Sequence, residues 1–137
     1  MKDMSTKSFG QKMNHTQHIQ WLRQAAAQQR PTLSERINRA WGVAYEAAQL
    51  LRQWYGVTRV RVFGSLLHPS RFHAESDVDL AVEGLAVDDY WDALADVLFL
   101  DEQITIDLVD PDLCPPAIWT IVEQEGVDLE RRPAHTP

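Results

Sequence analysis

The sequence predicts a fold that combines helices and strands (class α/β, more narrowly α+β). In this fold a small mixed β-sheet carries helices packed on one face. Apolar, β-branched residues alternate with polar ones at 57–63, 78–82 and 104–109, which is typical of strands with one buried face. Apolar residues at helical spacing precede and separate these runs, and the longest such stretch covers 33–55. We therefore expect N-terminal helices followed by a compact sheet.

The composition indicates one globular domain and excludes several classes of protein. The 137 residues are 45% hydrophobic and 24% charged, and no apolar run approaches the roughly 20 residues of a membrane span. Cys114 is the only cysteine, so no disulfide within the chain is expected and a reducing, cytoplasmic setting is favoured. A net charge of −7 disfavours autonomous binding to nucleic acid. It suits a basic protein partner, but solubility alone also explains it and is the favoured interpretation.

The helices and flanking segments divide the chain into four parts. The first helix, 16–29, has a thin apolar stripe and ends at Pro31. The second, 33–55, follows a capping box formed by Thr32 and Glu35. We expect a disordered lead, N-terminal helices that pack on the domain, the domain itself and a tail, over 1–13, 14–56, 57–130 and 131–137.

Residues that typically begin or end helices mark the other elements. Gly56 is placed to end the second helix. Asp88 is expected to cap a third helix that runs through Leu98. A last helix is expected at 117–125, after a Pro-Pro pair, with a short edge strand at 127–129.

One stretch carries the pattern of a catalytic site. Gly64 and Ser65 follow the first strand, and a turn of this kind offers backbone N–H groups and a hydroxyl to a phosphate. Asp77 and Asp79 accompany the second strand and, being two residues apart, point to one face about 7 Å apart. Two carboxylates so placed suit a hard divalent cation or a pair of them.

The third strand supplies a further carboxylate. Asp107 interrupts the apolar run Ile104–Val109, and a lone acid there is costly to bury without a partner. Strand alternation puts Asp107 on the face opposite Ile104, Ile106 and Leu108, so it can join the first two aspartates. The other candidates for this role flank the strand and are Asp101, Glu102, Asp110 and Asp112.

The ordered set of Gly64, Ser65, Asp77, Asp79 and Asp107 resembles the nucleotidyltransferase superfamily of DNA polymerase β type. In particular it resembles the minimal nucleotidyltransferase antitoxins, MntA type, of HEPN/MNT toxin–antitoxin modules. The similarity covers about 57–130. It implies a palm-like nucleotidyltransferase fold and a protein that uses ATP and Mg²⁺ to place AMP on a tyrosine of a partner HEPN toxin, an RNase.

The resemblance also implies a role for each residue. Gly64 and Ser65 would hold the phosphates of the nucleotide, while Asp77, Asp79 and Asp107 would be catalytic and bind two Mg²⁺ ions. The chain departs from the family pattern after the Gly-Ser pair, where many relatives carry a small residue, Arg and Gly, and this one has Leu-Leu-His-Pro. Its nearest basic side chain there belongs to Arg71, which either reaches the triphosphate or is a solvated loop residue.

Two other functions remain open from the sequence. A binding antitoxin would cover the active site of its toxin without catalysis, as the thin first helix and the acidic balance suggest. A nucleotidyltransferase acting on a small molecule is less favoured, because the chain has no second domain to form a substrate pocket.

Overall fold

The computed structural model describes residues 14–28 and 31–130 of the chain. It consists of two units, Met1–Thr32 and Leu33–Pro137, and each is described by itself. The predictions made for the lead at 1–13 and the tail at 131–137 fall outside the described residues. None of the described helices is both long and apolar enough to cross a bilayer.

The first unit contributes one described helix, α2 (His15–Gln28), whose start follows from local capping. The side-chain oxygen of Asn14 accepts a hydrogen bond from the N–H of Gln17 at 2.8 Å, and the Gln17 side chain accepts from the N–H of Asn14 at 3.1 Å. This reciprocal pair is a capping box with Asn at the N-cap, so the helix begins at His15, one residue before the predicted start.

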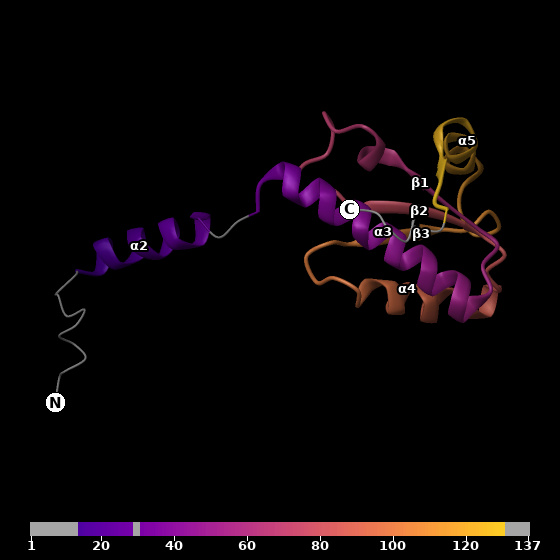
Figure 1. The fold of residues 1–137 in the computed structure, drawn as a ribbon, viewed down its shortest axis with the longest axis horizontal. Helices are drawn as coiled ribbons and strands as arrows, with labels where there is room; N and C mark the ends of the chain where they lie inside the picture. Colours follow the sequence, from indigo (N-terminus) through magenta and orange to yellow (C-terminus); the bar gives the residue numbers. More distant parts are fainter. Residues whose placement is uncertain (1–13, 29–30, 131–137) are drawn as a thin grey trace. The chain divides into compact units, whose positions relative to one another are not determined.

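The second unit is built on a four-stranded mixed sheet with the order β3-β2-β1-β4 (Figure 1). Strand β1 (Arg59–Phe63) runs antiparallel to β2 (Val78–Glu83) and to β4 (Val127–Asp128). Strand β3 (Ile106–Val109) runs parallel to β2. The mixed sheet and the α/β class agree with the sequence prediction.

One face of this sheet forms the main core. Helices α3 (Leu33–Tyr55) and α4 (Tyr90–Leu98) cover it, as Figure 1 shows. Apolar residues on alternate strand positions point into this core, which is why the strands read as alternating patterns in the sequence. The fully buried strand residues here are Val60, Val62, Val78, Leu80, Val82, Ile106 and Leu108.

The ends of the two covering helices have different causes. Gly56 has φ +67°, and the N–H of Val57 donates to the carbonyl of Leu51 at 3.3 Å, so α3 ends as predicted in a left-handed glycine. The prediction that Asp88 caps the next helix is wrong. Asp88 lies in a 3₁₀ turn, η2 (Val87–Asp89), and α4 begins after it at Tyr90.

The other face of the sheet is not open along its whole length. Helix α5 (Pro116–Glu125) packs on it, and Phe63, Ala81 and Val122 are buried in this second cluster. The prediction that the helices pack on one face is therefore wrong for α5. Ala81 shares strand parity with the aspartates, and so small a residue gives little sign in the sequence that its face is buried. Figure 1 shows α5 on the side of the strands away from α3 and α4.

Arg61 adds a polar contact between α5 and the sheet. Its side chain is buried, its guanidinium lies 5.4 Å from the ring centre of Trp119, and it forms an ion pair with Glu83 at 2.6 Å. Gly126 ends α5 next to Arg61. A Cβ on this residue would lie 2.5 Å from the carbonyl oxygen of Val122, which disfavours any larger side chain. Helix α5 therefore covers the strand face that carries Arg61.

Candidate active site

The uncovered end of the same sheet face carries the predicted aspartates. Asp79 of β2 and Asp107 of β3 are direct partners in the parallel register, so their side chains project from the same face of adjacent strands. Neighbouring strands lie about 4.8 Å apart. The register therefore brings together two acids that are separated by a helix in the sequence.

Asp77 lies just before β2, and a tight turn fixes the backbone that leads to it. The hydroxyl of Ser76 accepts from the N–H of His73 at 2.9 Å, and the N–H of Ser76 donates to the carbonyl of His73 at 3.0 Å. On the other side of Asp77, the N–H of Val78 donates to the carbonyl of Thr105 at 2.9 Å. Asp77 is exposed and enters the site from a constrained segment.

Gly64 approaches the aspartates more closely than the sequence alone indicated. It has φ +81°, a backbone conformation that favours glycine, and it opens the 3₁₀ turn η1 (Gly64–Leu67) directly after β1. A Cβ at this position would lie 2.3 Å from Oδ2 of Asp79. Glycine is therefore required here twice, by the turn and by the neighbouring carboxylate.

The remaining predicted residues lie along the loop that follows. The carbonyl of Ser65 accepts from the N–H of His68 at 2.9 Å, and the side chain of Ser65 is partly exposed. Leu66 is buried and anchors the turn in the core. Arg71 is an exposed loop residue, and none of the hydrogen bonds or ion pairs found for the described residues involves its side chain. Its predicted phosphate contact stays a prediction.

Like charges and burial act together on Asp79. Desolvation raises the pKa of Asp79 to about 6, and the neighbouring charges of Asp107 and Asp77 contribute in the same direction. No described Lys, Arg or His forms an ion pair with any of these three carboxylates. The site thus holds negative charge that the described part of the chain does not neutralise.

This donor set fits a hard cation in its chemistry. The three groups offer only oxygen, which Mg²⁺ prefers, and their mutual repulsion would be relieved by a positive ion. Within residues 14–28 and 31–130, however, no three His, Cys, Asp or Glu side chains are gathered closely enough to form a metal site. Metal binding by Asp77, Asp79 and Asp107 accordingly stays a prediction.

The alternative acids after α4 have other partners or positions. Asp101 forms an ion pair with Arg39, and its Oδ1 accepts from the N–H of Gln103 at 2.8 Å. Asp110 is buried and its Oδ1 accepts from the N–H of Asp112 at 2.8 Å, which stabilises the turn after β3. Of the acids near β3, Asp107 is the one paired in register with Asp79.

Tyr90 is a residue near the site whose role the sequence did not reveal. Its hydroxyl donates to the carbonyl of Leu108 at 2.6 Å and so ties the start of α4 to the strand that carries Asp107. Burial and the charges of Asp107 and Asp110 raise the pKa of Tyr90. The only sequence signal was general, namely that a tyrosine on an inward helix face needs a partner for its hydroxyl.

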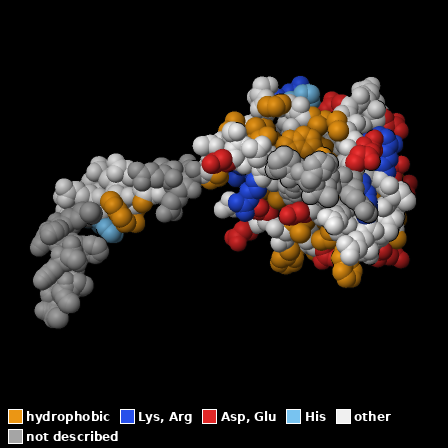
Figure 2. Space-filling model, viewed as in Figure 1, with side chains coloured by type: hydrophobic (Ala, Val, Ile, Leu, Met, Phe, Trp, Pro, Cys, Tyr) orange, Lys and Arg blue, Asp and Glu red, His pale blue; other side chains and the backbone are white. Residues whose placement is uncertain are grey.

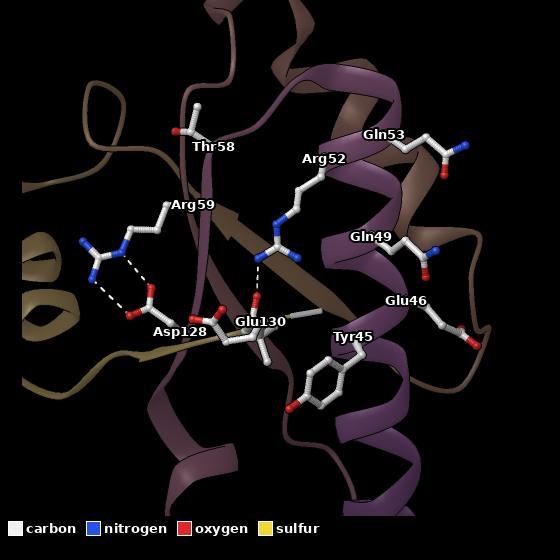
Figure 3. Close-up of a pocket in the computed structure, with 10 residues that line it drawn as sticks. Tyr45, Glu46, Gln49, Arg52, Gln53, Thr58, Arg59, Asp128 and Glu130 are labelled. Carbon is white, nitrogen blue, oxygen red and sulfur yellow. Dashed lines mark hydrogen bonds and ion pairs between the residues drawn. The ribbon is translucent and has the colours of Figure 1, made fainter. Parts of the chain in front are cut away.

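A groove of about 990 Å³ lies elsewhere on the unit, between α3 and the β1–β4 edge (Figure 3). Its arginines are already bound within the chain. Arg59 forms a two-pronged contact with Asp128 at 2.7 and 3.2 Å, and Arg52 donates to the carbonyl of Leu129. None of the predicted site residues lines this groove, and the contact of Arg59 with Asp128 joins β1 to the short edge strand β4.

Comparison with known protein families and with curated protein sequences finds no match. Solved structures do match. A crystal structure of a toxin–antitoxin with AMP-PNP has a TM-score of 0.52 and 22% identity, over 63% of this chain and 72% of that chain. A mutant MntA-HpeT toxin–antitoxin structure has a TM-score of 0.51 and 22% identity, over 62% of this chain and 70% of that chain.

A third structure, of a tri-AMPylated Shewanella oneidensis HEPN toxin in complex with MNT antitoxin, has a TM-score of 0.49 and 21% identity, over 66% of this chain and 71% of that chain. At the level of the fold, the first two likenesses confirm the predicted resemblance. The protein has an MNT nucleotidyltransferase-like fold.

Proposed function

We propose that this protein is an antitoxin that transfers AMP from ATP to a tyrosine hydroxyl of a partner HEPN-type RNase toxin and thereby neutralises it. The observation that carries the proposal is the register pair of Asp79 and Asp107 beside the close approach of Gly64. The motif resemblance supports it, as does the likeness to a toxin–antitoxin structure that contains AMP-PNP, an ATP analogue. The lone cysteine fits a cytoplasmic protein.

In this proposal each site residue has a role that follows from its chemistry. Backbone N–H groups of the Gly64–Ser65 turn and the Ser65 hydroxyl bind phosphate oxygens. Asp77, Asp79 and Asp107 would hold two Mg²⁺ ions, and such ions would neutralise charge on the triphosphate and lower the pKa of the acceptor hydroxyl. Arg71 supplies positive charge to the triphosphate from its loop.

The reaction forms one bond and breaks another. The tyrosine oxygen attacks the α-phosphorus of ATP, the bond from that phosphorus to the bridging oxygen breaks, and pyrophosphate leaves. Asp107 orients the tyrosine and accepts its proton. Its position favours this role, because Asp107 is exposed whereas Asp79 is partly buried behind Gly64. The net charge of −7 suits a toxin that is basic relative to this chain.

The direct test uses ATP, Mg²⁺ and the protein encoded by the adjacent reading frame, followed by intact mass spectrometry. The expected result is a gain of whole AMP masses on the partner, which EDTA abolishes and which Asp77→Asn or Asp79→Asn slows by about 10²- to 10³-fold. A partner that gains AMP equally with either variant would refute the assignment of the site.

A binding antitoxin remains the second candidate, and exposed apolar side chains on α4 favour it. Trp91 is 73% and Phe99 88% exposed, which supports a protein contact that needs no catalysis. The two functions separate in a variant with both Asp77→Asn and Asp79→Asn. Full neutralisation of the toxin by this variant supports binding alone, and loss of neutralisation with retained binding supports catalysis.

A further inference from the structure

Helix α4 has apolar side chains on more than the face it buries. Its inner face consists of Ala93 and Val97, both fully buried, with Tyr90 and Leu94 partly buried beside them. A helix that packs on one side of a sheet ordinarily has a polar outer surface. Here another line of apolar residues runs along the exposed part of the same helix.

This second line, which we call the α4 stripe, consists of Trp91, Ala95 and Leu98, with Phe99 at the end of the helix. The first three are spaced at i, i+4 and i+7, so they lie on one flank. Trp91 is 73%, Leu98 39% and Phe99 88% exposed. Figure 2 shows hydrophobic side chains protruding at the lower edge of the molecule, where Figure 1 places α4.

The shape of the stripe suits a helix. Ala95 is a small residue between two large ones, which leaves space for a ridge of a second helix to approach. A hollow of about 470 Å³ adjoins the end of the stripe and is lined in part by Leu98 and Phe99. Large exposed side chains beside a hollow are the features of an interaction site rather than of a solvated helix.

The surroundings of the stripe are strongly acidic. From Phe72 to Glu130 the sequence contains no Lys or Arg, and it contains every acidic residue of the chain except Asp3, Glu35 and Glu46. The exposed acids on or next to α4 are Asp88, Asp92, Asp96 and Glu102.

The arginines that α3 brings to this region are already engaged. Arg39 pairs with Asp101, and Arg36 donates to the carbonyl of Gln103 at 3.0 Å. A second copy of this chain would bring the same acids to the same place and would be repelled. Charge complementarity therefore selects a basic occupant.

We infer that the α4 stripe docks a helix of the partner protein, one with an apolar face flanked by Lys and Arg. The inference rests on the proposed function only in identifying that partner with the acceptor of AMP. The docking helix packs its apolar side chains around Ala95, and its cations face the exposed Asp88 and Asp92. Asp96 already accepts a hydrogen bond from the hydroxyl of Tyr55 on α3. The partner is thereby held on the sheet face opposite the aspartates, so its acceptor segment must reach around the sheet.

The test measures binding of the full chain to the protein encoded by the adjacent reading frame, by calorimetry. Trp91→Glu with Leu98→Glu is expected to weaken binding at least 30-fold, because an apolar contact is replaced by charge. The matched control is Trp54→Glu, which alters a tryptophan of equal 73% exposure on α3 and is expected to change binding less than 3-fold. Circular dichroism checks that each variant is folded.

A second measurement examines the charge component. Asp88→Asn with Asp92→Asn is expected to reduce the dependence of binding on salt between 50 and 300 mM. The inference is overturned if the stripe variant binds as tightly as the wild type, if the wild type does not bind this protein, or if the chain alone forms a dimer that the stripe variant dissociates. Failure of AMP transfer with stripe-dependent binding intact would refute the proposed function and leave the docking site standing.

Discussion

One face of the sheet has balanced charge at one end and unbalanced charge at the other. At the end covered by α5, Arg61 pairs with Glu83 at 2.6 Å and lies over Trp119, so the buried charge is balanced within the chain. At the uncovered end, Asp79 and Asp107 are direct neighbours with no described cation bound to either. Balanced charge stabilises a fold, whereas unbalanced charge on a rigid frame is suited to a ligand that brings the missing charge.

The largest expected effect is on catalysis at the uncovered end. Asp79→Asn is expected to lower the rate of AMP transfer by about 10²- to 10³-fold, because one preorganised charge of the site is lost. Asp107→Asn is expected to act similarly. The rate is followed by the mass of the partner protein over time, and Asp112→Asn, which alters an exposed acid in the turn after β3, should leave it unchanged. Equal rates for the Asp107 and Asp112 variants would remove Asp107 from the site.

The glycine beside the aspartates gives the next largest effect. Gly64→Ala is expected to lower the free energy of unfolding by about 1–3 kcal/mol, because its φ of +81° strains any other residue and the new Cβ meets Asp79. Gly42→Ala in α3, where a Cβ has nothing within 4 Å, is expected to raise it by about 0.5–1 kcal/mol. Urea denaturation of both variants measures the pair, and the prediction fails if the two changes have the same sign.

At the covered end the effect falls on stability alone. Arg61→Met is expected to lower the free energy of unfolding by about 1–2 kcal/mol, since it removes the closer partner of Glu83 and leaves that half-exposed acid only Arg59, at 3.7 Å, and water. Arg71→Met, on an exposed loop, should change it by less than about 0.5 kcal/mol. The same urea titration compares them. If the Arg61 variant also transferred less AMP per folded molecule, Arg61 would act on catalysis as well as on stability, which would contradict this prediction.

The smallest expected effect is a dependence of stability on pH. The pKa of Asp79 is about 6 in the folded protein against an ordinary value of 3.8, so its charged form is disfavoured by folding. This cost is fully present above pH 6 and disappears as the pH falls from 6 towards 3.8. Solvent screening reduces it to about 1 kcal/mol for this partly exposed group.

Thermal melts in EDTA measure that dependence. Above pH 6, Asp79→Asn is expected to be more stable than the wild type by roughly 4 °C in Tm, and the difference should vanish near pH 4. The control is Asp112→Asn, which alters an exposed acid that does not contribute to the raised pKa of Asp79. A wild type that loses stability relative to Asp79→Asn on acidification would show that the charge of Asp79 is favoured by folding.

Local pattern was sufficient for most of the secondary structure and for placing Asp79 and Asp107 on one face of the sheet, while the roles predicted for the site residues stay predictions. Strand alternation identified the faces of β1 and β2, and Gly56 marked the end of α3 in the expected place. These features depend on residues within a few positions of one another, and the constraints of strand parity and positive φ act at that range. The limits of local signals appear at Asp88, where a 3₁₀ turn separates the expected cap from α4.

By itself, the sequence determined the alternation that sends Asp79 and Asp107 to one face and the Gly-Ser turn that follows β1. Only the tertiary structure decided that the two aspartates are register partners, that Gly64 touches one of them, and that α5 covers Arg61 at the other end. The reason is physical, because strand order and helix placement depend on contacts between residues far apart in the chain. Strand alternation predicts the face on which a side chain lies, but only the packed structure shows which residues it contacts there.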